Sequence, residues 1–401
     1  MKFHVFRNGK TLEEFTVSGA YMFGVDSVPL RGLVKISFKN GCINCERKGT
    51  ESVGLSLLWP VEGCGHLLLS TTRLPEREDP YILNVELARA KLMEITVKRE
   101  EWGVFGTDDK SMELVRQSER FFVDSLKNIS NPEKASVLAD KSLKKGIAYA
   151  ERLAGKHSEL ILAARCKNNS LNRHSLGCCI DPDLMINEQY RKRVFEMFGS
   201  VTIPMSWAKL EPEQGKYDFG SIDRCIEGFA GRRLAVCAGP LLSFNKENLP
   251  KWMLKGKANF EKIRESCYEF VHEVVARYSD HIHAWRVISG MNVHNIFGFN
   301  YEQVVEITRT ATLAAKSANG KSRKIIDILM PWGEYYAEGK DAIAPLIYAD
   351  MVLQSGISFD AFGLQMHFGK DADGMRVRDM MQISSKLDSL GFMGKPLRIT
   401  G

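Results

Sequence analysis

Short apolar runs alternate with amphipathic stretches from residue 169 to residue 401, and this alternation constrains the fold more than any other feature. Each run ends in polar residues, glycine or proline, and the stretch that follows has the period of a helix. This order predicts parallel strands joined by crossover helices, as in a barrel or a doubly wound sheet. The strands are expected at Leu176–Ile180, Val201–Ile203, Leu234–Cys237, Ala284–Ile288, Lys324–Leu329, Ala361–Gln365 and Leu397–Thr400. The helices are expected at Gln189–Phe198, Ile222–Ala230, Phe260–Tyr278, Tyr301–Ala318 and Pro345–Gln354.

Residues 1–106 have a different pattern, in which short alternating runs are separated by turn residues. Asn8-Gly9 and Asn40-Gly41 lie between apolar runs, and Asn-Gly favours a hairpin because both turn residues need positive φ. Several strands at this spacing predict a β-sandwich, an architecture that glycan-binding modules often use. The expected strands are Phe3–Phe6, Leu33–Phe38, Val53–Leu58, His66–Ser70, Tyr81–Leu87 and Leu92–Val97.

Between these regions, residues 107–168 change to the helical period. Asn131 is suited to the N-cap of a helix and Pro132 to its first helical position. We therefore expect two or three helices that link the sandwich to residues 169–401. No catalytic group is expected in this linker.

The composition is that of an ordinary soluble protein, since 44% of the 401 residues are hydrophobic and 26% are charged. The net charge of +6 is spread along the chain, which argues against nucleic acid as a partner. No apolar run approaches the ~18 residues of a membrane span, and the N-terminus has no secretory apolar region. Nine cysteines without framework spacing suit a reducing compartment, so we predict a cytoplasmic protein. No cofactor is predicted.

Cys42 and Cys45, with Cys64 and His66 downstream, form a loose pattern of zinc-ligating residue types. Two of these groups lie in strand-like apolar runs, so buried structural thiols are the preferred interpretation. No metal site is predicted.

Four tracts, taken in order, resemble glycoside hydrolase family 10, the β-1,4-xylanase family with a (β/α)8 barrel. They are Trp207–Phe219 after the second strand, Ile282–Ile288 at the fourth, Gly363–His367 at the sixth and Pro396–Thr400 at the seventh. The pattern suits a divergent bacterial member that carries an N-terminal β-domain. The resemblance implies a TIM-type barrel over residues 169–401 that acts on β-1,4-linked glycans.

A retaining glycosidase needs two carboxyl groups ~5–5.5 Å apart, one to protonate the leaving oxygen and one to attack the anomeric carbon. The resemblance implies that these groups follow strands 4 and 7, where the family has Asn-Glu and Thr-Glu. This sequence has Ser289-Gly290 at the first place and Thr400-Gly401 at the second. Glycine has no side chain for proton transfer or attack, so both catalytic positions are predicted to be lost.

Glu334 follows the fifth expected strand and is the carboxylate that could take over a catalytic role, with a solvated or structural acid as the alternative. Gln365 and His367 form either part of a sugar site or a polar network, and the tryptophans either stack on sugars or pack in the barrel. The candidate substrate-binding residues are Trp207, Gln365, His367, Trp332 and Asn292, with His294 as a further rim group.

Near the first two strands, Asp181 is a reachable carboxylate that an ordinary turn would also explain. Thr202, Ile203 and Ser206 stand where the resemblance implies Glu, Asn and Lys that hold sugar. The second-strand tract is therefore altered as well.

Two functions are compatible with these features. One is a hydrolase of xylan-like β-1,4-glycans, and the other is a non-catalytic glycan-binding or scaffolding protein on a barrel that has lost its acids. Either has a polysaccharide or oligosaccharide as partner. Because strand 7 ends at residue 401, we expect a barrel that appears truncated: a fragment, or a barrel closed by homo-oligomerisation or by another segment.

Overall fold

The computed structural model describes residues 1–400 except 33, 104–107, 230, 256–258 and 340. Leu33, Ala230, Gly401 and the expected boundary at residues 106 and 107 therefore lie outside the described residues. The chain packs into two compact units. The first comprises Met1–Ala164, Trp332–Glu338 and His367–Ser389. The second comprises Arg165–Pro331, Gly339–Met366 and Leu390–Gly401.

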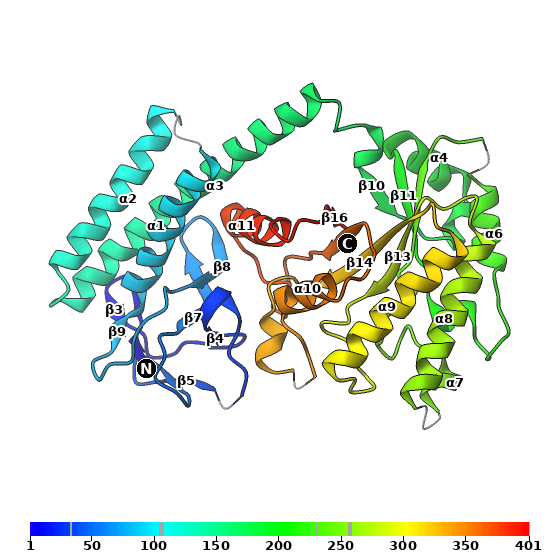
Figure 1. Ribbon diagram of the computed structural model, residues 1–401. Coiled ribbons are helices and arrows are strands. Elements are labelled where there is room, and N and C mark those ends of the chain that lie inside the picture. The colour runs from blue at the N-terminus through cyan, green and yellow to red at the C-terminus, as the bar shows by residue number, and fades with distance from the viewer. Residues whose placement is uncertain (33, 104–107, 230, 256–258, 340, 401) are drawn as a thin grey trace. The chain divides into compact units, whose positions relative to one another are not determined.

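A parallel sheet of seven strands organises the second unit, and its strands pair in chain order (Figure 1). They are β10 (Gly177–Cys179), β11 (Ser200–Ile203), β12 (Ala235–Ala238), β13 (Ala284–Ser289), β14 (Arg323–Leu329), β15 (Ala361–Gln365) and β16 (Leu397–Ile399). Each strand overlaps the position predicted for it, so that prediction is confirmed. The arrangement fits a barrel built from βα repeats.

The helices between these strands supply the crossovers. They are α4 (Glu188–Met197), α5 (Trp207–Leu210), α6 (Gly220–Glu227), α7 (Lys251–Leu254), α8 (Phe260–Arg277), α9 (Tyr301–Ala318) and α10 (Pro345–Gln354). Helices α8 and α9 lie side by side along the sheet (Figure 1). Asn259 and Asn300 cap them, since each Asn side chain accepts a hydrogen bond from a backbone amide of the first turn.

Strand register determines which side chains share a level of the sheet. Pairing places Ser289, Asp327, Gly363 and Arg398 in one row across β13 to β16. Another group on the same sheet, Cys237, Ala284 and Ile325, forms a small apolar cluster. The interior thus combines an apolar layer with a layer that carries charge.

The first unit contains a four-stranded sheet, a three-stranded sheet and a two-stranded hairpin. The strands are β1 (Lys2–His4), β2 (Phe6–Arg7), β3 (Lys10–Thr11), β4 (Tyr21–Phe23), β5 (Lys35–Lys39), β6 (Cys42–Glu46), β7 (Gly54–Val61), β8 (Gly65–Ser70) and β9 (Tyr81–Ile82). Their orders are β5-β6-β1-β9, β4-β7-β8 and β2-β3. Phe3 and Ile43 of the larger sheet share one hydrophobic core with Leu57 and Leu69 of the other. The sandwich itself remains a prediction.

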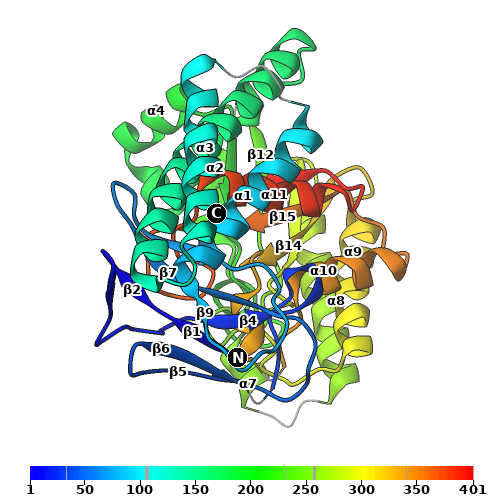
Figure 2. The same ribbon diagram turned by 90° about the vertical axis from the view of Figure 1, so that its left-hand side faces the viewer.

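Three helices follow these strands, and Figure 2 shows them beside the sheets of the unit. They are α1 (Leu83–Trp102), α2 (Asp109–Lys127) and α3 (Pro132–Lys167). Asn131 caps α3 as predicted, because its Oδ1 accepts a hydrogen bond from the Lys134 amide at 3.1 Å. Among the described residues no helix has the length and apolar character needed to cross a bilayer.

Helix α1 corrects the prediction of strands at Tyr81–Leu87 and Leu92–Val97. Only Tyr81 and Ile82 are extended, and the helix begins at Leu83. Every residue from Tyr81 to Ala88 is buried. The buried polar residues Asn84 and Glu86 alternate with apolar residues, so the stretch has the period of a strand in the sequence although it forms a helix.

The last helix, α11 (Met380–Gly391), was not predicted. Met381 packs against Ile95 and Tyr149 of the first unit, and Asp379 lies 2.6 Å from Lys91 of α1. The segments that follow β14 and β15 are therefore structural parts of the N-terminal unit.

Candidate functional site

The end of β13 is the position at which the sequence predicts the loss of a catalytic acid. Gly290 has a φ of +72°, in the left-handed region that favours glycine. A Cβ added there would lie 2.5 Å from Leu329 Cδ1 and 3.1 Å from His294 Cδ2. Both the backbone conformation and the surroundings are thus those of a glycine. Gly401, the other position, lies outside the described residues.

Glu334 lies after β14 and is only 2% exposed. Its carboxylate accepts hydrogen bonds from the Gly374 amide and from the guanidinium group of Arg378. A second guanidinium, that of Arg376, lies 3.2 Å away. Three donors therefore hold the two carboxylate oxygens within the first unit, an arrangement typical of a structural ion pair.

Both candidate tryptophans are covered by protein side chains. Trp207 is 1% exposed, its ring stacks on Phe270 with centroids 4.7 Å apart, and its Nε1 donates to Glu211 at 2.6 Å. Trp332 is 6% exposed, and the Arg378 guanidinium lies 4.6 Å from its ring centroid. These contacts leave little ring surface for a sugar to stack on.

Asn292 is fully buried, and its side chain links the loop after β13 to the end of β14 by hydrogen bonds. Its Nδ2 donates to the Leu329 carbonyl at 2.7 Å, and its Oδ1 accepts from the Leu329 amide at 3.2 Å. Gln365 is half-buried at the end of β15 in the second unit, whereas His367 is exposed and belongs to the first unit. The structure does not gather these three residues within one unit.

The candidates near β10 and β11 have local partners. Asp181 Oδ1 accepts a hydrogen bond from the Asp183 amide at 3.0 Å, which is an ordinary turn contact. Thr202 is half-buried and hydrogen-bonds to the Cys237 thiol. Ser206 is half-buried at the N-cap of α5.

The interior of the sheet holds a buried ion pair that the sequence analysis missed. Arg286 Nε donates to Asp327 Oδ2 at 2.6 Å, and the two residues are 6% and 0% exposed. Burial raises the pKa of Asp327, and the Arg286 charge opposes that rise. An added Cβ on Gly363 would lie 1.9 Å from Asp327 Oδ1, so this glycine makes room for the carboxylate. The available signal was a charged residue inside each of two apolar runs.

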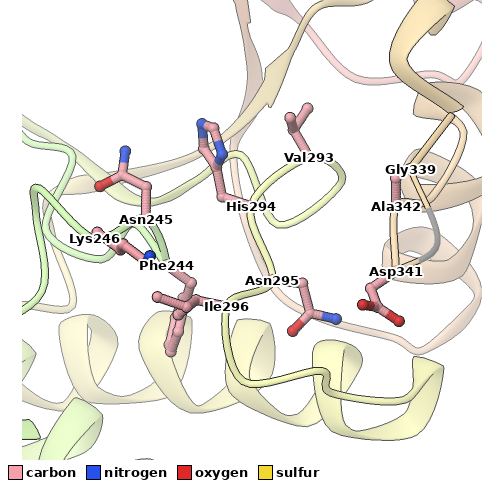
Figure 3. A pocket seen from close by; sticks show the side chains of 10 residues that line it. All are labelled: Phe244, Asn245, Lys246, Val293, His294, Asn295, Ile296, Gly339, Asp341 and Ala342. Carbon is pink, nitrogen blue, oxygen red and sulfur yellow. The ribbon is translucent and has the colours of Figure 1, made fainter. Parts of the chain in front are cut away.

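A cavity of about 360 Å³ opens within the second unit, near the carboxyl ends of β12, β13 and β14. Barrel enzymes bind their ligands at this end of the strands, and the volume is at the small end of the range for ligand pockets. Three segments line it (Figure 3): Phe244, Asn245 and Lys246; Val293, His294, Asn295 and Ile296; and Gly339, Asp341 and Ala342. Of these residues, only His294 was predicted from the sequence, as a rim group.

His294 is the titratable aromatic group of this pocket. Its backbone amide donates to the Gly290 carbonyl at 2.7 Å, and its ring is half-buried. Burial lowers the pKa of His294, and the carboxylate of Glu247 opposes that change. The imidazole is therefore neutral at neutral pH.

The zinc-like pattern of the N-terminal region does not come together as a metal site. Cys45 is buried in β6, and burial raises the pKa of its thiol to about 12, whereas Cys64 is exposed. Within the described ranges, no three His, Cys, Asp or Glu side chains are arranged to hold a metal ion.

Solved structures that are similar to this chain include xylanases. An endoxylanase of family 10 from a sugarcane soil metagenome is 15% identical, with 57% of this chain and 66% of that chain covered and a TM-score of 0.46. Xylanase 10B from Thermotoga maritima is 18% identical, with 56% and 68% covered and a TM-score of 0.44. Xylanase 10C from Cellvibrio japonicus is 16% identical, with 56% and 49% covered and a TM-score of 0.47.

The chain thus spans about two thirds of the length of the first two structures. The family model described as glycosyl hydrolase family 10 matches residues 166–401, which is more than half of the sequence. The chain belongs to glycosyl hydrolase family 10.

Proposed function

We propose that this protein binds a β-1,4-linked glycan at the strand ends of its parallel sheet without hydrolysing it by a two-carboxylate mechanism. The observation that carries the proposal is Gly290. A retaining glycosidase needs a proton donor beside the scissile bond. At this position the backbone is left-handed, and the Leu329 side chain occupies the space that a longer side chain would enter.

The state of Glu334 supports the same conclusion. A replacement acid needs a carboxyl group that can reach the glycosidic oxygen. Glu334 is buried against Arg376 and Arg378, and removing it would leave the Arg378 guanidinium without its carboxylate, while Arg376 would keep Asp371 and Asp373. We therefore assign Glu334 a structural role rather than the catalytic role considered from the sequence.

The pocket at the ends of β12 to β14 supports the binding function. It combines apolar surface from Val293 and Ile296 with polar groups from Asn245, His294 and Asp341. Sugars present both apolar faces and hydroxyl groups, and such a mixed lining suits them. The family relatives include a xylanase 10C of Cellvibrio japonicus solved with xylopentaose, so a xylo-oligosaccharide is the first ligand to test.

Calorimetry, chromatography and NMR spectra of the same sample test the proposal. Isothermal titration calorimetry with xylopentaose reports binding, and chromatography of the incubated mixture reports shorter products. Binding without products is the expected result. Product release would overturn the non-catalytic part of the proposal, and absence of binding heat together with an unchanged NMR spectrum would overturn the binding part.

A pocket variant with a matched control locates the binding. Asp341 lies at the pocket, whereas Asp350 is an exposed residue of α10. Asp341→Ala is expected to weaken xylopentaose binding about tenfold, because a hydrogen bond to a charged group is lost. Asp350→Ala should bind like the unmodified protein. Equal affinities for both variants would place the glycan elsewhere.

A further inference from the structure

We infer that His294 is the residue that recognises the glycan in this pocket, with its imidazole ring hydrogen-bonded to a sugar hydroxyl group at the end of β13. The inference rests on the proposed function and names a specificity-determining residue within it.

The ring takes its position from Gly290. The amides of Val293 and His294 both donate to the Gly290 carbonyl, at 2.9 and 2.7 Å, and so fold the chain back over the strand end. An added Cβ at residue 290 would lie 3.1 Å from His294 Cδ2. A side chain at residue 290 would therefore crowd the imidazole, which would have to shift by a few tenths of an ångström. The loss of the acid and the placement of the histidine are linked by geometry.

The two ring nitrogens of His294 form no hydrogen bond with the described part of the chain. His294 hydrogen-bonds to these residues through its backbone amide. The side chain of its neighbour Asn295, by contrast, is hydrogen-bonded to the backbone carbonyl and amide of Phe299, each at 2.8 Å. A half-buried imidazole without a partner loses hydration and gains no hydrogen bond in return. A sugar hydroxyl group can accept from the N–H of a neutral imidazole or donate to its other nitrogen, so two hydroxyl groups of an oligosaccharide satisfy both ring nitrogens.

The charges around the ring favour a neutral ligand. Lys246 and Asp341 line the pocket, and the Glu247 carboxylate acts on the imidazole, so the charged groups of the site are one positive and two negative. No single sign dominates strongly enough to select an anion. A neutral oligosaccharide, recognised by its hydroxyl groups, fits this balance best.

Binding should consequently depend on pH. A protonated imidazole has two donors and no acceptor, and a bound sugar further desolvates the ring. The ligand thus binds the neutral form, and affinity falls as pH drops through the His294 pKa. Burial holds that pKa below its ordinary value, so the loss of affinity lies on the acidic side of neutrality.

Calorimetry with xylopentaose at about pH 7.5 and pH 5 tests the inference. The unmodified protein should bind more weakly at the lower pH, because protonation of His294 competes with the ligand. His294→Gln keeps a donor and an acceptor but does not titrate, so it should bind at both pH values with similar affinity. His294→Leu should lose about tenfold in affinity at the higher pH. His272→Gln on α8 is the matched control and should behave like the unmodified protein.

The outcomes separate the two proposals. If the unmodified protein binds and His294→Leu binds equally well, the inference is wrong and the proposed function stands. The same holds if His294→Gln retains the full pH dependence. If the unmodified protein binds xylopentaose at neither pH, the proposed function is wrong and this inference is wrong with it. Should His294→Leu fail to fold, the pH profile of His294→Gln decides.

Discussion

The loops after β13 and β14 follow neighbouring strands of one sheet, yet they hold their titratable side chains in opposite ways. After β14, Glu334 is 2% exposed and bound by Arg376 and Arg378. After β13, His294 is half-buried with a ring that lines a pocket. Position at the carboxyl end of a barrel strand favours a functional role. The partners of each side chain decide whether it can meet a ligand.

Packing explains the difference. The segment Trp332–Glu338 belongs to the first unit, where residues that follow β15 supply the guanidinium groups that surround Glu334. A carboxylate buried this deeply needs full pairing, so its oxygens are committed to structure. The loop that carries His294 stays in the second unit, and none of the described side chains forms an ion pair with its ring.

The largest effect is expected in the loop after β14, where Glu334 is paired. Glu334→Gln removes the carboxylate that pairs with the buried Arg378 guanidinium and that shares Arg376 with Asp371 and Asp373, and breaking a buried pair in this way costs about 3–5 kcal/mol. Urea denaturation followed by circular dichroism measures the loss. Glu338→Gln, at an exposed neighbouring position, should change stability by less than about 0.5 kcal/mol. A similar small change for Glu334→Gln would contradict the structural role.

A second variant places a carboxyl group at the end of β13, next to the loop that carries His294. Gly290→Glu combines a left-handed backbone with a clash against Leu329, and we expect a loss of roughly 2–4 kcal/mol in the free energy of unfolding. Hydrolysis of xylopentaose should not appear. Gly298→Glu is the matched control, since its φ is +65° and no atom lies within 4 Å of its added Cβ. Equal losses for the two variants would show that the clash with Leu329 is unimportant.

Asp140 of α3 extends the comparison with a smaller effect, because it is a half-buried carboxylate whose partner among the described residues is an amide. Asn84 Nδ2 donates to it at 2.8 Å, and burial raises the pKa of Asp140 to about 6. Folding therefore favours the protonated form. That stabilisation is complete below the ordinary pKa of 3.8 and is lost as pH rises through about 6.

Asp140→Asn should accordingly raise stability by about 1–3 kcal/mol at pH 8 and change it little at pH 4. Denaturation curves at the two pH values measure the gain. Asp280→Asn, at an exposed position, should have no pH-dependent effect. A loss of stability at pH 8 would mean that the ionised carboxylate is favoured in the folded protein.

Local patterns in the sequence located most of the second unit. The prediction at Ala361–Gln365 matches β15 residue for residue, and Asn131 caps α3 as its residue type indicated. Such signals need only neighbours within a few turns or one strand. They failed at the start of Leu83–Trp102, where the buried polar residues Asn84 and Glu86 alternate with apolar residues and give the period of a strand.

The candidate site was less accessible to sequence reasoning, because partners distant in the chain define it. Arg376 lies 42 residues beyond Glu334, and Asp327 lies 41 residues beyond Arg286. Neither spacing forms a motif. The pocket draws on three loops in the same way, and only His294 was recognised in advance as a rim group.

By itself, the sequence determined the parallel strand order and the absence of a carboxyl group at residue 290, because both follow from residue types and local periodicity. Tertiary structure alone decided that Glu334 is enclosed by two arginines and that the His294 ring lies over Gly290. Burial and pairing depend on which distant segments pack together, and no local pattern records that packing.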